Sequence, residues 1–144
     1  MVKVHIVCVG KLKEGYLREA AGEYLKRLSR FCKAEVTELA ERATLAEEAE
    51  DIKKYLRGRV FVLAIEGKQL SSEAFAGEIK TACDEGEELT FVIGSSCGLH
   101  GSVKEGARLL SFSKMTFPHQ LMRVILLEQI YRAFMINAGA EYHK

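Results

Sequence analysis

The sequence predicts a single α/β domain across residues 1–144, with a largely parallel sheet and helices on both faces. Apolar runs of strand length alternate along the chain with amphipathic segments of helix length. The twelve glycines lie mostly where one such segment should end. A chain of 144 residues can bury a core without disulfides or metal, and no linker or repeat divides it.

The first half of the chain predicts strand, helix, strand and helix. Val2–Val9 alternates apolar and polar residues and ends at a glycine, which is typical of a strand. Residues 15–31 place apolar side chains at three- and four-residue steps, which indicates a helix, and residues 35–39 form a weak strand. The apolar face of the next helix is marked by Leu45, Ala49, Ile52 and Leu56.

The middle of the chain predicts two buried strands around a helix. The run "RVFVLAIEG" at residues 59–67 is continuously apolar, as in a strand covered on both faces. Ser71 or Ser72 can cap a helix that continues to Cys83, and "LTFVIG" at residues 89–94 is the next buried strand.

The C-terminal part predicts a short helix at residues 103–110, a last strand at 109–113, and a final helix that begins at Pro118. Apolar residues surround most of this final helix between residues 121 and 136. We therefore expect it to form the interface of a homodimer. The alternative is that it lies deep against the sheet under other elements.

Composition and residue spacing exclude several classes of protein. With 48% hydrophobic and 28% charged residues, the chain resembles a soluble globular protein, and it contains neither a signal peptide nor an apolar run of membrane-spanning length. The histidines show no metal-like spacing, so no metal is expected. The cysteines, which form no C-x-x-C pair, are expected to be reduced thiols in a cytoplasmic protein: Cys8, Cys32, Cys83 and Cys97.

Charge is divided unevenly along the chain. Residues 1–33 hold eight Lys or Arg against three Glu, residues 34–97 hold seven against fourteen acids, and residues 98–144 hold six against three. If the fold brings the two basic ends together, they could meet an anionic partner. The alternative is a set of solvated helix faces.

The turn "GSSCG" at residues 94–98 matches the G-x-S-x-G pattern of a serine hydrolase centred on Ser96. No aspartate follows it, and the chain is short for that fold. The remaining candidates for the acid and base of a triad are Glu105 or Glu128 with His119 or His143. The alternative is a glycine turn that lets a ligand approach the backbone.

Two further motifs are weaker evidence for a catalytic or binding site. Cys97 and His100 could be a thiol nucleophile and its base, but three residues apart in a glycine loop they are more simply unrelated. The segment "GKLKEGY" at residues 10–16 lacks the lysine and hydroxyl of a phosphate loop, although Lys11 and Lys13 could join an anion-binding patch.

The segment "SFSKMTFPH" at residues 111–119 combines hydroxyls and backbone amides with apolar surface. That mixture suits a neutral heteroaromatic base with polar edges. The alternative, which the residues alone favour, is a strand end that packs its aromatic side chains in the core.

A resemblance to a known family is carried by the run "LSFSKMTFPHQLMRVILLEQIYRAFMINAGAEYHK", with "VGKLKE", "IEGKQLSSE", "VIG" and "GLH". The chain closely resembles the RlmH family over nearly its whole length. Members of this family are 23S rRNA pseudouridine N3-methyltransferases of the SPOUT class. The resemblance is weakest at residues 38–59, where this chain is shorter. It implies an α/β fold with a C-terminal trefoil knot, a homodimer, and S-adenosylmethionine as the cofactor.

By position, the resemblance implies cofactor contacts on three loops that follow strands. These contacts are Leu63, Gly94, Phe112, Ser113, Lys114, Met115, Thr116 and Phe117. Where the family usually has a second glycine, this chain has Ser95, which could restrict the loop if that position needs a positive φ.

The resemblance also implies that the tail "EYHK" reaches the active site of the partner subunit. His143 is then the candidate base for the N3 proton, Tyr142 a stacking or hydrogen-bonding platform, and Arg132 a contact to phosphate or a ring oxygen. The alternatives are an ion pair between Arg132 and Glu128, and a solvated tail.

We expect the basic ends to bind rRNA phosphates, with recognition of the assembled ribosome by shape. Candidates for these contacts are Lys3, Lys11, Lys13 and Arg18. Two other functions remain open, a serine hydrolase and a non-catalytic RNA-binding protein.

Overall fold

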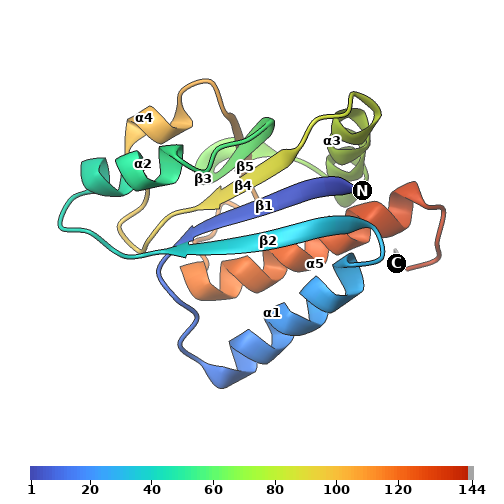
Figure 1. The fold of residues 1–144 in the computed structure, drawn as a ribbon, viewed down its shortest axis with the longest axis horizontal. Coiled ribbons are helices and arrows are strands. Elements are labelled where there is room, and N and C mark those ends of the chain that lie inside the picture. Colours follow the sequence, from blue (N-terminus) through green and yellow to red (C-terminus); the bar gives the residue numbers. More distant parts are fainter. Residues whose placement is uncertain (143–144) are drawn as a thin grey trace.

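The computed structural model describes residues 1–142, and within them five parallel strands form one sheet (Figure 1). Its order is β2-β1-β4-β3-β5, with strands β1 (Val2–Val9), β2 (Cys32–Leu39), β3 (Arg59–Gln69), β4 (Leu89–Ile93) and β5 (Arg108–Ser111). The helices are α1 (Gly15–Leu28), α2 (Leu45–Lys53), α3 (Ser72–Asp84), α4 (Gly101–Lys104) and α5 (His119–Asn137). The predicted parallel α/β architecture is confirmed.

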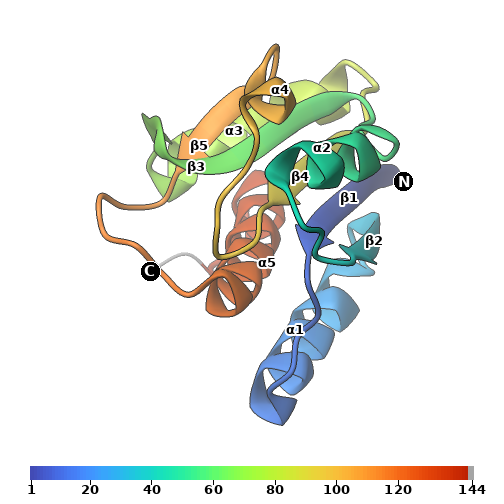
Figure 2. The ribbon, with the colours of Figure 1, turned by 90° about the vertical axis from the view of Figure 1, so that its left-hand side faces the viewer.

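Helices cover both faces of the sheet, as predicted. Helices α1, α3 and α5 pack on one face, and α2 and α4 on the other (Figures 1 and 2). Successive side chains of a strand point to opposite faces, so on β4 Phe91 joins the first core and Val92 the second.

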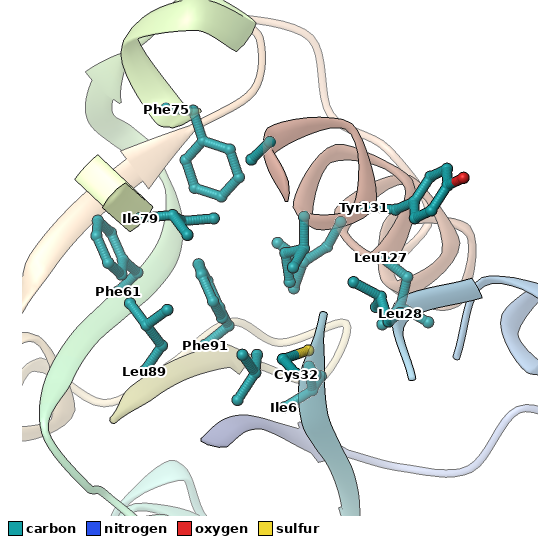
Figure 3. Close-up of a cluster of buried hydrophobic side chains, with 14 of the residues drawn as sticks. Ile6, Leu28, Cys32, Phe61, Phe75, Ile79, Leu89, Phe91, Leu127 and Tyr131 are labelled. Atoms are coloured by element: carbon teal, nitrogen blue, oxygen red, sulfur yellow. The ribbon is translucent and has the colours of Figure 1, made fainter. Parts of the chain in front are cut away.

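The larger core holds α5 against the sheet. The rings of Phe61 and Phe91 stack with centroids 5.2 Å apart, and Phe75 of α3 meets Phe91 edge-on at 5.9 Å (Figure 3). Each aromatic pair contributes about 1 kcal/mol beyond the burial of its area. Leu127 and Tyr131 of α5 belong to the same core, and α5 lies against both α1 and α3.

Burial within one chain accounts for one face of α5. Its buried apolar and aromatic side chains are Leu126, Leu127, Ile130, Tyr131, Ala133 and Phe134. Five others remain partly exposed, namely Met122, Val124, Ile125, Met135 and Ile136, and Leu121 is exposed. The sequence therefore overstates how much of this helix needs a partner, but an apolar surface is left over.

The early elements differ from prediction at their ends. β2 begins at Cys32, before the predicted residues 35–39, because it pairs with β1 along its whole length from Val2↔Cys32 to Val9↔Leu39. α1 ends at Leu28, before the predicted residue 31, and α2 ends at Lys53 rather than reaching Leu56.

The predicted helix at residues 103–110 is wrong. α4 ends at Lys104, and Gly106, with φ +73°, reverses the chain in a conformation that glycine adopts without strain. Arg108 then starts β5 by pairing with Phe61 of β3. The strand predicted at residues 109–113 therefore lies at Arg108–Ser111, because the next residues turn away from the sheet.

β3 is covered on both faces only in its first half. Phe61 and Val62 are buried, but from Ile65 onward, beyond the end of its pairing with β4, all residues of β3 except the half-buried Gly67 are exposed. Its register with β5 shifts between Leu63 and Lys68, so residues 64–67 bulge out of the ladder. The prediction of full burial along residues 59–67 is therefore wrong, and the bulge borders the site described next.

Candidate functional site

A cavity of about 260 Å³ opens at the carboxyl ends of β3, β4 and β5. Its walls come from the bulged part of β3 at residues 63–66, from the segments at residues 93–99 and 110–117, and from the first turn of α5. Leu63 thus lies within β3 and not after it, because the strand continues to Gln69. Ligands of parallel α/β sheets bind at this edge. The three segments that hold the cofactor contacts implied by the resemblance therefore meet in one place, whereas residues 10–16 do not line the cavity.

Polar groups in the loop after β5 form hydrogen bonds with one another. The Ser111 hydroxyl donates to the carbonyl oxygen of Ser113 at 3.0 Å, and the Ser113 hydroxyl accepts from the backbone N–H of Met115 at 3.0 Å. Such short-range bonds stabilise a compact turn. Phe112 and Phe117 consequently line the cavity, while Met115, 75% exposed, lies at its mouth.

The turn after β4 requires glycine at position 94. A Cβ on Gly94 would lie 2.6 Å from the Gly98 carbonyl oxygen and 2.6 Å from Leu99 Cγ. Gly98 itself has φ +90°. This turn packs its backbone on itself and leaves its outer side to the cavity.

Ser95 does not restrict this turn. Among the described residues no non-glycine residue has a positive φ, so the backbone at Ser95 is one that serine adopts freely. Its hydroxyl donates to Glu48 Oε1 at 3.4 Å and accepts from the backbone N–H of Cys97 at 3.3 Å. The departure from the family pattern therefore ties the turn to α2.

The rim of the cavity is polar. Lys104 Nζ donates to Glu66 Oε2 at 2.8 Å, and this hydrogen bond lowers the pKa of Glu66. His119 and Met122 of α5 complete the opposite side. An apolar interior with charges at the mouth suits a ligand with a flat apolar part and a charged end.

The predicted cofactor contacts lie together. Apart from Lys114, which is exposed and does not line the cavity, all of them form its wall: Leu63, Gly94, Phe112, Ser113, Met115, Thr116 and Phe117. Other wall residues were not predicted as contacts, among them Ile65, Glu66, Ile93, Leu99, Lys104, Leu110, His119 and Met122. Position after a strand was the available signal, and it marked segments rather than single side chains.

The predicted catalytic residues form a second cluster outside this cavity. Arg132 makes a two-point ion pair with Glu128, with Nε to Oε1 at 3.2 Å and Nη2 to Oε2 at 2.9 Å. Tyr142 donates its hydroxyl to Glu128 at 3.0 Å, and its ring lies 5.1 Å from the Arg132 guanidinium carbon. Burial, and then the bond to Glu128, raises the pKa of Tyr142 to about 12.

This cluster lies two to three turns along α5 from the wall residues of the cavity. The ion pair that the sequence left as an alternative role for Arg132 is thus present. His143, the predicted base, lies outside the described residues.

The family described as "Predicted SPOUT methyltransferase" matches residues 2–143. The chain belongs to this SPOUT methyltransferase family. Proteins named ribosomal RNA large subunit methyltransferase H are similar along their whole length. Those of Streptococcus equi subsp. zooepidemicus (strain MGCS10565) and Bifidobacterium animalis subsp. lactis (strain AD011) are 50% and 54% identical, over 99% of this chain and 100% of their own. The resemblance seen in the sequence is confirmed.

A solved structure of a methylase-family protein from Neisseria gonorrhoeae has a similar fold. It aligns with a TM-score of 0.55 at 11% identity and covers 90% of this chain and 82% of its own. At that identity the likeness concerns the fold alone. It agrees with the five-stranded parallel sheet of this SPOUT methyltransferase.

The hydrolase motif does not assemble a triad in this SPOUT chain. Ser96 is exposed, and among residues 1–142 no histidine is hydrogen-bonded to it. His100 instead caps α4, with its Nδ1 2.8 Å from the Ser102 hydroxyl. Within the described part of the chain, His100 is therefore hydrogen-bonded to neither Ser96 nor Cys97.

Two further properties concern the described part of the SPOUT domain. No helix within it has the length and apolar character needed to cross a membrane. No cluster of three or more His, Cys, Asp or Glu side chains suited to a metal ion occurs within it.

Proposed function

We propose that this SPOUT methyltransferase transfers a methyl group from S-adenosylmethionine to N3 of a pseudouridine in 23S rRNA of the assembled ribosome, in the cytoplasm. The observation that carries the proposal is the cavity at the strand ends, built from the three segments that the family resemblance marks. The relatives' names, which specify ribosomal RNA of the large subunit, support the substrate class.

The residues of the cavity fit this cofactor. Leu63, Phe112 and Phe117 offer apolar surface for a purine ring, and Gly94 lets the turn after β4 pack closely against Gly98 and Leu99 and so form one wall of the cavity. Lys104 and Glu66 at the rim are suited to the charged amino-acid end. Bound there, S-adenosylmethionine supplies an electrophilic methyl group on a sulfonium.

The chain's own contribution is positioning and proton removal. The N3 proton of a uracil-like ring is weakly acidic and must leave before that nitrogen becomes a good nucleophile. His143 is the proposed base, and Arg132 the proposed contact to a ring oxygen or phosphate. Glu128 fixes the plane of the Arg132 guanidinium through two hydrogen bonds, and Tyr142 covers its face.

A homodimer would explain why these groups lie outside the cavity of their own chain. Two copies joined along α5 would bring the Arg132 and Tyr142 cluster of one chain to the cavity of the other. Partly exposed apolar residues of α5, among them Leu121, support this arrangement. Light scattering after size exclusion tests it, and a mass of 16.1 kDa would contradict it.

The trefoil knot of the family belongs to the same proposal. The segment after β5 leaves the sheet, lines the cavity, and returns as α5 under the opposite face from α4 (Figure 2). The turn after β4 packs closely on itself beside that path. A knotted path through this turn is the arrangement that these features support.

The decisive experiment is mass spectrometry of 23S rRNA from cells with and without the gene. N3-methylpseudouridine should vanish on deletion and return with the wild-type gene. Unchanged content would overturn the assigned reaction. Calorimetry with S-adenosylhomocysteine separates the alternatives, because a non-catalytic RNA-binding protein would give no heat of binding, and a Ser96→Ala change would matter only in a hydrolase.

A further inference from the structure

The loop between β1 and α1, residues 10–14, is held in one conformation by contacts from outside itself. Leu12 is 8% exposed and packs into the larger core. Its backbone N–H donates to Glu38 Oε2 at the end of β2, at 3.2 Å. Arg18, from the first turn of α1, donates to the carbonyl oxygens of Lys13 at 2.7 Å and Leu12 at 3.2 Å. The loop is therefore ordered although its flanking side chains are exposed.

Helix α5 supplies the remaining contacts. The buried guanidinium of Arg123 donates from Nη2 to the carbonyl oxygen of Gly10 at 3.0 Å, and its Nη1 pairs with Glu38. The Gln120 side chain accepts from the backbone N–H of Lys13 at 3.2 Å. Gln120 lies between His119 and Met122, which line the cavity. The loop is thus attached to the turn of α5 that borders the cavity.

The fixed backbone displays two lysines and a tyrosine. Because Leu12 points inward, Lys11 and Lys13 on either side of it are exposed, and within the described part of the chain neither forms an ion pair. Tyr16 follows at 68% exposure. Arg18 is already committed to the loop carbonyls, so the sequence-based expectation that it binds phosphate has a competing structural role.

Acidic groups surround the loop without an ion pair to its lysines among the described residues. Glu38 is paired with Arg123. Glu41 has Oε1 3.4 Å from where a Cβ on Gly10 would lie, and Glu14 and Glu19 are exposed around the start of α1. These carboxylates flank the lysines without a hydrogen bond to either ammonium among the described residues. Both ammonium groups therefore remain available to phosphates, as two point charges among acidic neighbours and not as a patch of net positive charge.

We propose that Lys11, Lys13 and Tyr16 form an RNA-binding surface beside the cavity, with the lysines on consecutive phosphates and the Tyr16 ring stacked on an unpaired base. This inference rests on the proposed function and names where the rRNA meets the chain. A preformed loop loses little entropy on binding. Lysines on phosphates give salt-dependent affinity, and an exposed aromatic ring stacks on any splayed base. Attachment to α5 then fixes the strand relative to the cavity.

The test compares two double variants with the same change in charge. Lys11→Gln/Lys13→Gln removes the proposed contacts, and Lys26→Gln/Lys33→Gln removes two exposed lysines near the end of α1 and the start of β2, at the amino ends of the strands. Methyl transfer is measured on ribosomes from a strain lacking the gene, between 50 and about 200 mM salt. We expect the first variant to raise KM roughly tenfold and to lower the slope of log affinity against log salt by about 1 to 2, with kcat unchanged. The control should behave as wild type.

Tyr16→Ala tests the stacking contact separately. Loss of one base–aromatic contact should raise KM about tenfold without changing the salt slope. Calorimetry with S-adenosylhomocysteine should give the wild-type affinity for all three variants, which shows that the cavity is intact.

Several outcomes would overturn the inference. A wild-type KM and salt slope for Lys11→Gln/Lys13→Gln would do so, and so would equal losses in both double variants, which would indicate net charge alone. A change in mass by light scattering with an unaltered salt slope would assign the loop to an interface between copies. If the wild-type protein methylates no ribosomes, the proposed function fails first. Co-sedimentation of the same variants with ribosomes then still tests the surface.

Discussion

Arg123 of α5 donates a hydrogen bond to the carbonyl oxygen of Gly10 at 3.0 Å and pairs with Glu38 through the same guanidinium. One buried side chain thus joins the ends of β1 and β2 to the helix that lines the cavity. Its Nε has no hydrogen-bond partner among the described residues, which offsets part of this stabilisation.

Replacing Arg123 with methionine should lower the free energy of unfolding by about 2 kcal/mol. Breaking a buried pair costs more, but the Glu38 side chain is 34% exposed and water screens it. Urea denaturation measures the change. Arg42→Met, which removes an ion pair between a surface arginine and Asp51, is the control and should lower the stability by less. Equal losses in the two variants would contradict the importance of the buried pair.

The pair should also make stability depend on pH. Burial alone would raise the pKa of Glu38, but hydrogen bonds from Arg123 and the Leu12 N–H outweigh it, so this pKa lies below its usual value. The stabilisation is therefore present above the pKa of a free glutamate, about 4.3, and is lost as pH falls through the lower folded value. Glu38→Gln should be less stable than wild type at pH 7, and the gap in urea midpoints should narrow in acid. If the difference in urea midpoint between wild type and Glu38→Gln instead widens below pH 4, the pKa of Glu38 is not lowered by folding.

Gly94→Ala should disturb the cavity. Its Cβ would meet the Gly98 backbone and Leu99 at 2.6 Å, so the turn must move, at a cost of roughly 1 to 3 kcal/mol. We expect weaker binding of S-adenosylhomocysteine by calorimetry and a lower urea midpoint. Gly101→Ala is the matched control, because nothing lies within 4 Å of its added Cβ. If Gly94→Ala and Gly101→Ala bind S-adenosylhomocysteine with the same affinity, the turn after β4 does not shape the cavity.

Tyr142→Phe should remove a tyrosine whose pKa lies above the usual value. The pKa of Tyr142 is about 12 because of burial and then the bond to Glu128, so this bond stabilises the fold fully below pH 10 and is lost as pH rises through about 12. Tyrosinate absorbance should show a transition near 12 in wild type and in Tyr16→Phe, but not in Tyr142→Phe. The variant should lose about 1 kcal/mol of stability at pH 7. Survival of the late transition would assign it to another tyrosine.

Cys97 should be the thiol that reacts first in the native protein. It is exposed, whereas burial raises the pKa of Cys8 to about 11 and of Cys32 to about 12. Burial also raises the pKa of the half-buried Cys83. A disulfide reagent at pH 8 should modify one thiol rapidly, and Cys97→Ser should abolish that phase while Cys83→Ser retains it. A rapid phase that persists without Cys97 would refute this order.

Predictions from the sequence were wrong where a local pattern is compatible with two structures. The segment "ARLL" could continue a helix or start a strand, and pairing of Arg108 and Leu109 with β3 decides between them. Likewise, the apolar run of β3 does not show that its neighbour β4 stops at Ile93, which leaves Ile65 exposed. By contrast, the bounds of Val2–Val9 and a serine cap, which the structure places at Ser71 rather than Ser72, were predicted correctly, because alternation and hydroxyl capping are properties of a few consecutive residues.

The α/β class, the family and the segments that meet at the cavity could be predicted from the sequence, since each is encoded in local patterns or in one long matching run. The sequence did not show that β3 continues past Leu63 to Gln69, or which side chains meet. Arg123 reaches Glu38 and Gly10 across 85 and 113 residues of chain, and Ser95 reaches Glu48 across 47. Such contacts depend on strand order and on the path of α5 beneath the sheet, which periodicity does not encode. The same topology gives the loop at residues 10–14 its fixed place beside the cavity.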